Sequence, residues 1–430
     1  MDVNTRLPRT HDVPLSLDRP VHRLSPDSAD IHHDATVMRD AGPVVPVTLP
    51  GDVPVWAVTQ DAVARTVLRA PDVFSSDRRN WRALRAGGIP ADWPLMGLAA
   101  PQGRSLITVD RPDHSYLRGP LATVFTEKRV RALTPLIEEV TDRLLDQLAT
   151  AAHASADGTA DFRKQVAWPL PMTIICHLLG VPEADHAMLR ERFEVLFDDT
   201  QDPTDAVAGL SAYLHRHLER MRHTPGDDLT SALLNLSGGK RLTDPELVAA
   251  LQVLIVAGHE TTVHLLVNAV RALTAHREQL ALLRTGEVPW SRAVEEVLRW
   301  DPPTANFLLR FATRPATLGD TAIQAGDPVM ISYIAMGRDP ERYGPTAAQF
   351  DVRNVRGHTS FGHGIHVCLG APLARLEGRI VLQRLFKRWP DLTVTGSPRR
   401  SPTVLMNSYA NLSVRLAPAD DRPADTRTEA

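Results

Sequence analysis

The sequence contains little cysteine and almost no lysine. Only Cys176 and Cys368 occur among its 430 residues. Two widely separated cysteines form no disulfide framework, so we expect the protein to work in the reducing cytoplasm. Lysine is equally scarce, since 44 of the 48 basic residues are arginines. We attribute this bias to GC-rich coding and not to function.

The chain also lacks an excess of charge and an apolar leader. Its net charge is −3 and 23% of its residues are charged, which argues against a nucleic-acid partner. Residues 1–20 are polar, without the apolar run of a signal peptide, so we expect no membrane anchor. No Gly/Ser linker or internal repeat divides the chain. We therefore expect an irregular arm over residues 1–25, one domain over 26–417 and a disordered tail over 418–430.

Helical patterns dominate the rest of the sequence. Two β-rich runs, Val44 to Thr48 and Val53 to Thr59, flank a Pro-Gly turn and predict a hairpin. Thr243 to His276 is the longest helical pattern and begins with the spacing of a capping box. Its segment 247–257 is apolar on every face, which predicts a helix through the core, and Gly258 with its polar neighbours ends the run before it could span a membrane. The expected fold class is mainly α (α+β): a single large helical domain with small peripheral β-sheets.

The densest chemical motif is Phe-Gly-His-Gly-Ile-His-Val-Cys-Leu-Gly, residues 361–370, which an apolar, helix-like run follows. Glycine permits positive φ and close approach of the backbone, so we expect a tight loop pressed against a flat group. A thiolate of Cys368 would be stabilised by the N–H groups and dipole at the start of the next helix. A haem iron is the group that most needs one thiolate, because thiolate ligation favours cleavage of the O–O bond.

Two plainer interpretations compete with a haem site. A lone cysteine before a helix is most often a buried small hydrophobe. His358, His363, His366 and Cys368 are also all zinc-ligand types, although structural zinc sites usually offer paired cysteines. The other cysteine, Cys176, lies in an apolar run and is expected in the core.

The pattern Phe-Gly-x-Gly-x-His-x-Cys-x-Gly, complete in residues 361–370, resembles the haem-binding loop of the cytochrome P450 family. The resemblance extends over residues 44–416 and is to the soluble, actinobacterial-type bacterial branch. It implies the cytochrome P450 fold, haem b as the cofactor and Cys368 as the axial ligand of the iron. Phe361 and Gly370 are then expected to contact the haem.

Residues 257–262, Ala-Gly-His-Glu-Thr-Thr, resemble the family's oxygen-activation motif. The resemblance implies that Gly258 lets the helix approach a flat cofactor and that the helix opens locally beside it. Glu260 and Thr261 are then the residues that deliver protons to dioxygen. The plainer alternative is a kinked helix with a satisfied buried carboxylate, since an unpaired one is costly.

Haem carries two propionates, which need cations or strong donors. His114 and Arg118 are four residues apart and share one face of a predicted helix. This segment resembles the helix that binds the propionates in the family. Arg310 and His366 match two further propionate contacts by the same resemblance.

Glu296 and Arg299 are three residues apart on a predicted helix and can therefore pair. They resemble the pair that braces the haem loop in the family, which is a structural role. The third partner of this pair is expected to be Arg353, counted back from the loop, with Arg356 as the alternative.

The resulting hypothesis is a haem-thiolate monooxygenase that hydroxylates or epoxidises an apolar small molecule such as a steroid, a macrolide or another secondary metabolite. Dioxygen is the co-substrate, and the resemblance implies a separate ferredoxin and ferredoxin reductase as electron donors. A peroxygenase or oxidative coupling enzyme is one alternative, and a non-catalytic haem-binding sensor or carrier is another. Glu260 and Thr261 argue against a carrier, which needs no proton relay.

Family topology also gives expected contact surfaces. Asn306 and Asn407 are expected to orient a substrate oxygen inside the pocket. The residues expected to line that pocket are Trp81, Met96, Val253, Val256, Ala257, Asn306, Met406 and Asn407. The basic residues expected to meet an acidic ferredoxin are Arg375, Arg379, Arg384, Lys387 and Arg388.

Overall fold

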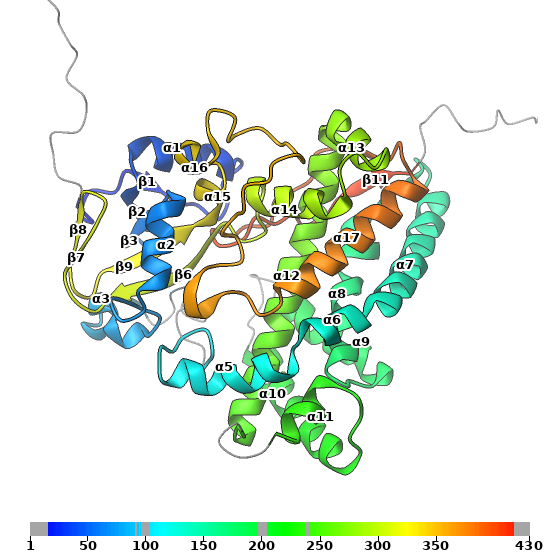
Figure 1. Cartoon of the computed structure of the whole chain (residues 1–430), viewed down its shortest axis with the longest axis horizontal. Helices are drawn as coiled ribbons and strands as arrows, with labels where there is room; N and C mark the ends of the chain where they lie inside the picture. The colour runs from blue at the N-terminus through cyan, green and yellow to red at the C-terminus, as the bar shows by residue number, and fades with distance from the viewer. Residues whose placement is uncertain are drawn as a thin grey trace, which may run out of the picture.

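The computed structural model describes residues 16–90, 93, 95, 104–196, 204–236 and 241–416. A sheet-rich region and a larger helical region lie side by side (Figure 1). The expected fold class is confirmed, because helices make up most of the described chain and the sheets are small.

The largest sheet has six strands in the order β1-β2-β3-β9-β6-β4. Strands β2 and β3 form the predicted hairpin, in antiparallel register from Val44 opposite Val58 to Leu49 opposite Val53. Its turn uses Gly51, at a φ of 77°, a conformation that favours glycine. The six strands are β1 (His22–Arg23), β2 (Val44–Leu49), β3 (Val53–Val58), β4 (Phe74–Ser75), β6 (Asn306–Ala312) and β9 (Pro328–Ser332).

Two smaller sheets complete the β structure. One joins β10 (Thr393–Val394), β11 (Ser413–Arg415) and β5 (Thr159–Asp161), and the other joins β7 (Ala316–Leu318) and β8 (Thr321–Ile323).

The N-terminal range expected to be an irregular arm contains β1, which pairs with β2. From His22 onward the chain is therefore already part of the sheet. The expected tail, residues 418–430, lies outside the described residues.

The helices on the sheet side are short, whereas the helical region contains the longest helices, α7, α10 and α12 (Figure 1). The first group comprises α1 (Ile31–Ala41), α2 (Asp61–Arg69), α3 (Arg82–Arg85), α15 (Tyr333–Met336), α16 (Pro340–Tyr343) and the 3-10 turn η1 (Arg78–Asn80). The second comprises α5 (Asp113–Val124), α6 (Glu127–Ala132), α7 (Thr134–Ala154), α8 (Pro169–Leu178), α9 (Glu183–Leu196), α10 (Thr204–His223), α11 (Leu229–Leu234), α12 (Asp244–Ala275), α13 (Arg277–Arg284), α14 (Trp290–Trp300), α17 (Ala371–Arg388) and the π-helix η2 (Arg163–Ala167).

Helix α12 is the central element of the helical region. It begins with the predicted capping box, in which the Glu246 carboxylate accepts the backbone N–H of Thr243 at 3.0 Å. By length and composition α12 could cross a membrane, but 61% of its most apolar window is buried inside the structure. It packs against α8, α10, α14 and α17, which confirms the prediction of a core helix.

Cys176 of α8 lies in the main hydrophobic core, as predicted. Its side chain is 1% exposed. Burial raises the pKa of the Cys176 thiol to about 12, so this cysteine is unsuited to act as a thiolate.

Candidate active site

Two glycines fold the loop that carries the second cysteine. Gly362 and Gly364 have φ values of 75° and 74°, in the left-handed region that favours glycine. A Cβ on Gly364 would lie 2.2 Å from the carbonyl oxygen of Leu68 in α2, so a larger residue cannot fit without moving the backbone. The backbone N–H of Cys368 donates to the Phe361 carbonyl at 2.8 Å. The loop is thereby closed on itself and held against α2.

Cys368 presents its thiol just before α17. The backbone N–H groups of Gly370 and Ala371 donate to its sulfur, and Arg118 and Arg375 place positive charge near it. Burial raises the pKa of the Cys368 thiol, and these four groups offset part of that rise. The side chain nevertheless has accessible surface. A sulfur that is both accessible and surrounded by protein lies in a recess, where a metal ion could bind and deprotonate it.

The structure brings the four predicted propionate-binding residues together. The rings of His114 and His366 are 4.4 Å apart between centroids, and the charges of Arg118 and Arg310 both act on His366. Arg118 also donates to the carbonyl of Val367 at 2.8 Å, which ties α5 to the loop. These contacts gather helix α5, strand β6 and the loop around one point.

Arg310 and His114 of this cluster lack polar partners of the kind that a carboxylate could supply. Arg310 is 3% exposed, and its hydrogen bond to the carbonyl of Leu309 is long, at 3.4 Å. No carboxylate of the described chain lies within ion-pair distance of it, and a buried guanidinium without a counter-charge is strongly destabilising. Burial, and then the charges of His366 and Arg118, lower the pKa of His114 to about 4, and its buried Nε2 has no hydrogen-bond partner in the described chain. A haem, with one thiolate ligand and two propionates, fits this set of groups.

Ser76 and Asp110 belong to the same cluster, and sequence reasoning missed them. The Ser76 hydroxyl lies 2.9 Å from Nε2 of His366, and the Asp110 carboxylate accepts the Ser76 backbone N–H at 3.0 Å. Burial alone would raise the pKa of Asp110, but hydrogen bonds from His366, Ser75 and Ser76 hold it below its usual value. Neither residue belongs to a local motif: the pairing of β4 with β6 places Ser76 near the loop, and Asp110 reaches it through its hydrogen bonds to Ser75 and Ser76.

The acid of α12 is buried and paired. Oε1 of Glu260 lies 2.6 Å from Nε2 of His264, one turn further along the helix. Burial alone would raise the pKa of Glu260, but the charge and hydrogen bond of His264 outweigh it and lower the pKa below its usual value. The hydroxyl of Thr261 donates to the Ala257 carbonyl at 2.7 Å, which leaves its lone pairs as acceptors. His264 is a functional candidate that the sequence could have revealed, since acid and imidazole are four residues apart.

One expectation about α12 is wrong. The helix is assigned without a break from Asp244 to Ala275, and the hydroxyls of Thr261 and Thr262 donate to the carbonyls of Ala257 and Gly258 within it. A Cβ on Gly258 would meet Ile175 of α8 at 3.7 Å, an ordinary contact, so Gly258 faces α8 and not a cofactor. The accessible positions beside it are Val256 and Ala257.

Glu296 and Arg299 form the predicted pair, in bidentate geometry. Their nitrogen–oxygen distances are 2.8 and 2.6 Å, and both side chains are about 2% exposed. The Arg299 guanidinium also donates to the carbonyls of Gly337, Ala347 and Gln349. The pair therefore fixes the irregular segment that precedes the cysteine loop.

The predicted third partner of this pair is wrong. Arg353 pairs instead with Glu287 at 2.9 Å, and both side chains are more than half exposed. The alternative, Arg356, donates to the carbonyl of Arg342. Glu296 instead accepts the backbone N–H of Asp351 at 2.8 Å and the side-chain amide of Asn354 at 3.3 Å. Counting residues back from the loop fails because the segment between them is irregular.

The histidines of a possible zinc site point to separate partners. His358 bonds to Glu295 at 3.2 Å, His363 accepts from Arg69 and His366 bonds to Ser76. Among the described residues, no three or more His, Cys, Asp or Glu side chains gather in a way that could hold a metal ion. A zinc site at this loop therefore has no structural support.

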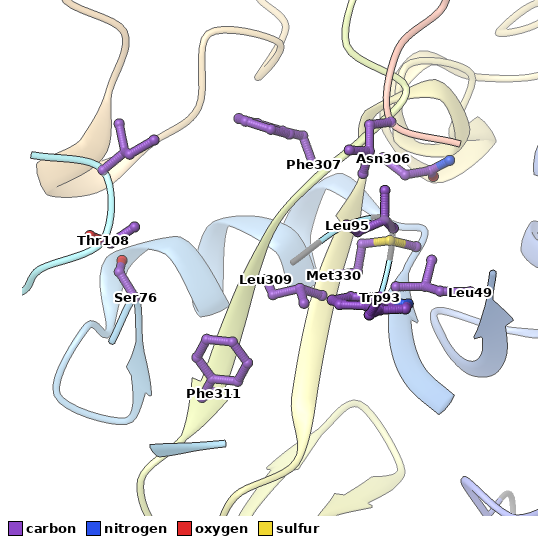
Figure 2. A pocket seen from close by; sticks show the side chains of 12 residues that line it. Leu49, Ser76, Trp93, Leu95, Thr108, Asn306, Phe307, Leu309, Phe311 and Met330 are labelled. Carbon is purple, nitrogen blue, oxygen red and sulfur yellow. The ribbon is translucent and has the colours of Figure 1, made fainter. Parts of the chain in front are cut away.

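A cavity adjoins the propionate cluster, since Ser76 lines it and bonds to His366. Figure 2 shows Ser76 and Thr108 close together, with Leu49, Trp93 and Met330 gathered on the other side of β6. No lining residue in the described chain carries a charge. The lining is Leu49, Ser76, Trp93, Leu95, Ile107, Thr108, Asn306, Phe307, Leu309, Phe311, Met330 and Leu405.

The two asparagines expected to orient a substrate are already occupied. Asn306 donates to the Val404 carbonyl at 2.9 Å and accepts the Ser332 hydroxyl at 2.7 Å. Asn407 is fully buried, donates to the Asp301 carboxylate at 2.6 Å and accepts from Arg400. Asn306 lines the cavity, as predicted, and its role in orienting a substrate oxygen stays a prediction. Asn407 is not in the lining, and its amide joins the side chains of Asp301 and Arg400 instead.

None of the other expected pocket residues in the described chain lines this cavity. Trp81 is 1% exposed and stacks on Phe311 at 5.4 Å, in the core behind the cavity wall. Met406 forms an isolated bridge with Thr304, and Met96 lies outside the described residues. Val253, Val256 and Ala257 lie on α12, partly accessible, but not in the lining of this cavity.

Most of the expected basic face on α17 is neutralised by acids of α7 and α14. Three of its five cations are in ion pairs: Arg375 with Glu295, Arg384 with Glu138 and Asp142, and Arg388 with Asp146. Arg379 and Lys387 form no ion pair with the described residues.

Comparison with known proteins gives one consistent result. The model of the family described as Cytochrome P450 matches residues 290–406. The chain is 41% identical to cytochrome P450 monooxygenase PikC of Streptomyces venezuelae over 86% of both chains. It is 39% identical to vitamin D(3) 25-hydroxylase of Pseudonocardia autotrophica, over 84% of this chain and 87% of that one. Among solved structures, CYP154C4 from Streptomyces sp. ATCC 11861 with testosterone bound matches with a TM-score of 0.86 and 43% identity, over 92% of this chain and 98% of that one.

The ligand assignment predicts different behaviour for the two cysteines. Cys368→Ser should abolish the red-shifted absorption band that a thiolate-ligated, reduced haem gives with carbon monoxide, because serine supplies no thiolate. Cys176→Ser should retain the band, because that sulfur lies in the core. Absorption spectra of the two purified variants test this, and a retained band in Cys368→Ser would contradict the assignment.

The observed contacts of Glu296 and Arg353 predict that their substitutions differ in their effect on stability. Glu296→Ala should lower the free energy of unfolding by about 3–5 kcal/mol, because Arg299 is left buried without its partner. Arg353→Ala should cost less than about 1 kcal/mol, because its ion pair with Glu287 is exposed. Urea unfolding of both variants provides the comparison. Equal losses of unfolding free energy would support Arg353 as the third partner of Glu296 and Arg299.

Proposed function

This chain belongs to the cytochrome P450 family of monooxygenases, and we propose that it hydroxylates an uncharged, apolar polycyclic or macrocyclic molecule. Membership makes haem iron its cofactor, and we assign haem b, the form that needs no covalent attachment. When bound, this haem supplies the reductive activation of dioxygen. The chain's own residues hold the cofactor, orient the substrate and move protons.

The apolar cavity is the single observation that carries the proposed substrate class. Its described lining is uncharged, and the buried amide of Asn306 is satisfied within the protein. An ionised substrate group would therefore be desolvated without a partner, which is costly. A lone hydroxyl or ketone could still be accommodated beside Ser76 and Thr108. One relative is named a vitamin D(3) 25-hydroxylase, and the structure of another, CYP154C4, has testosterone bound.

We assign the propionates to His114, Arg118, Arg310 and His366, and the axial thiolate to Cys368. The support is the uncompensated charge of Arg310 and the buried, unpartnered Nε2 of His114. The two N–H groups that donate to sulfur favour the thiolate.

We assign proton delivery to Glu260 and Thr261. With its proton donated to the Ala257 carbonyl, the Thr261 hydroxyl accepts a hydrogen bond from a water on the path to the reaction centre. Glu260 is buried and ionised, and can take up a proton and release it. A carrier or sensor would gain nothing from a buried carboxylate at this position.

We propose a ferredoxin and its reductase as the electron donors, docking on the cysteine side. The support is reduced to Arg379 and Lys387, because the other cations of α17 are already paired. Docking should therefore depend on a few charges.

The substrate class predicts selective binding. Testosterone and vitamin D3 should shift the haem absorption on binding, whereas a fatty acid should bind at least about tenfold more weakly, because its carboxylate must be desolvated. Val256→Phe tests the separate expectation that α12 faces the substrate: it should weaken binding or change the product position, since Val256 is accessible on α12 although it does not line the cavity. Val355→Phe, on an exposed loop position, is the control. Equal affinity for charged and uncharged compounds would contradict the proposed class.

The proton-delivery role predicts uncoupling. Thr261→Ala removes a hydroxyl but little volume, so haem content and substrate affinity should persist while reductant use continues, product falls and hydrogen peroxide accumulates. Thr262→Ala should be milder, because its side chain is rotated about 100° around the helix. The ratio of product to reductant consumed, with peroxide quantified, is the measurement. Full coupling in Thr261→Ala would remove this residue from the mechanism.

The docking proposal predicts a salt-dependent reduction rate that relies on few residues. Lys387→Glu and Arg379→Glu should each slow reduction by a ferredoxin at low salt, and the effect should shrink as screening shortens to about 8 Å at physiological ionic strength. Lys164→Glu, exposed on η2, should leave the rate unchanged. Stopped-flow reduction measures these rates. A rate insensitive to both reversals would place the partner elsewhere.

A further inference from the structure

The carboxylate of Glu260 is held at one oxygen only. Oε1 is 2.6 Å from Nε2 of His264. Oε2 is buried and has no hydrogen-bond partner in the part of the chain that the structure describes. Nδ1 of His259 lies 3.9 Å from Oε2, beyond hydrogen-bond reach. One oxygen is thus fixed and the other is unengaged.

His264 makes no other hydrogen bond with the described residues. Its side chain is 1% exposed, and its second ring nitrogen, Nδ1, is buried without a partner. A buried polar ring normally satisfies both nitrogens. His217 of α10, by comparison, bonds to the Leu179 carbonyl at 2.9 Å and to Arg220 at 2.8 Å. Within the described chain, the only contact that accounts for a polar residue at position 264 is therefore its bond to Glu260.

The surroundings of the pair are positively biased. The titratable and charged groups that act on Glu260 are His264 and His259 of α12 and Arg163 of η2. Arg163 comes from a π-helical turn that packs against α12, a distortion often found at functional sites. His264 and Arg163 oppose the effect of burial and favour the ionised form of Glu260, whereas burial lowers the pKa of His259 to about 4 and leaves that ring uncharged at neutral pH.

We propose that His264 is a positioning residue for proton delivery: it anchors Oε1 of Glu260 and leaves Oε2 to take up and release the proton. This inference rests on the proposed role of Glu260 and Thr261. It assigns no contact between His264 and the haem or the substrate.

Loss of His264 should reverse the titration behaviour of Glu260. With His264 present, the pKa of Glu260 is below its usual value, so the ionised side chain contributes stability at neutral pH, which is lost as pH falls through that pKa. Without His264, burial dominates and raises the pKa of Glu260. The side chain then contributes stability only at low pH, and that stability is lost as pH rises through the raised pKa.

The first experiment measures coupling with testosterone as the probe substrate in the haem-loaded enzyme. His264→Leu should lower the ratio of product to peroxide by about tenfold, the size expected for one lost hydrogen bond to a charged group. His264→Gln should recover most of the ratio, because its amide can donate at the place of Nε2. His217→Leu also removes a buried imidazole and should leave the ratio unchanged. Normal coupling in His264→Leu, or a His264→Gln variant that fails as badly, would overturn the inference.

The second experiment follows the melting temperature of the haem-loaded protein from about pH 5 to about pH 8 and does not depend on turnover. His264→Leu should lose stability with rising pH relative to the double variant His264→Leu/Glu260→Gln, which lacks the titrating group. Parallel curves for these two variants would overturn the inference. If Glu260→Gln alone stayed fully coupled, the proposed proton-delivery role would fail. If Glu260→Gln uncoupled the enzyme and His264→Leu did not, only the inference about His264 would fail.

Discussion

The buried guanidinium of Arg299 is the interaction on which the cysteine side of the molecule depends. It pairs with Glu296 and donates to three backbone carbonyls between residues 337 and 349. Apart from the one-turn helix α16, that segment is irregular, so the carbonyls of Gly337, Ala347 and Gln349 would otherwise be unsatisfied inside the protein. A buried ion pair adds little net stability, because desolvation offsets most of the attraction. Its value here is geometric: one planar group with five donors fixes the chain that leads into the loop of Cys368.

A second buried carboxylate joins segments that are far apart in sequence. Asp301, at the end of α14, accepts from His32 near the N-terminus and from Asn407 near the C-terminus. Arg271 of α12 lies 3.4 Å from the same carboxylate. Burial would raise the pKa of Asp301, but its hydrogen bond and charge contact with His32, together with the arginines, lower it to about 2. The Asp301 carboxylate therefore joins α1 of the sheet region, α12 of the helical region and the segment around Asn407.

How much was predictable from sequence depended on whether a residue acts through its own neighbours or through distant ones. The fold, the loop of Cys368, the capping box of α12 and the Glu296–Arg299 pair all follow local patterns, and the structure contains each of them. The prediction for Arg353 was wrong because it lies in an irregular segment. In such a segment the direction of a side chain does not follow from its spacing along the sequence. Asn306 lines the cavity as predicted and Asn407 does not, because a buried amide can face either a cavity or a partner inside the protein, and only tertiary contacts determine which.

The position of Asn306 has a consequence for how this enzyme could change its substrate. Its amide ties β6 to β9 and to the C-terminal turn at Val404, so backbone hydrogen bonds hold one wall of the cavity in place. The side chains that cover this wall, such as Phe307 and Leu309, are apolar and only partly buried at the edge of the hydrophobic core. Exchanges among apolar residues there can redraw the cavity while the fold remains intact. Selectivity in this wall is therefore separable from stability, which makes it a natural region for divergence between relatives.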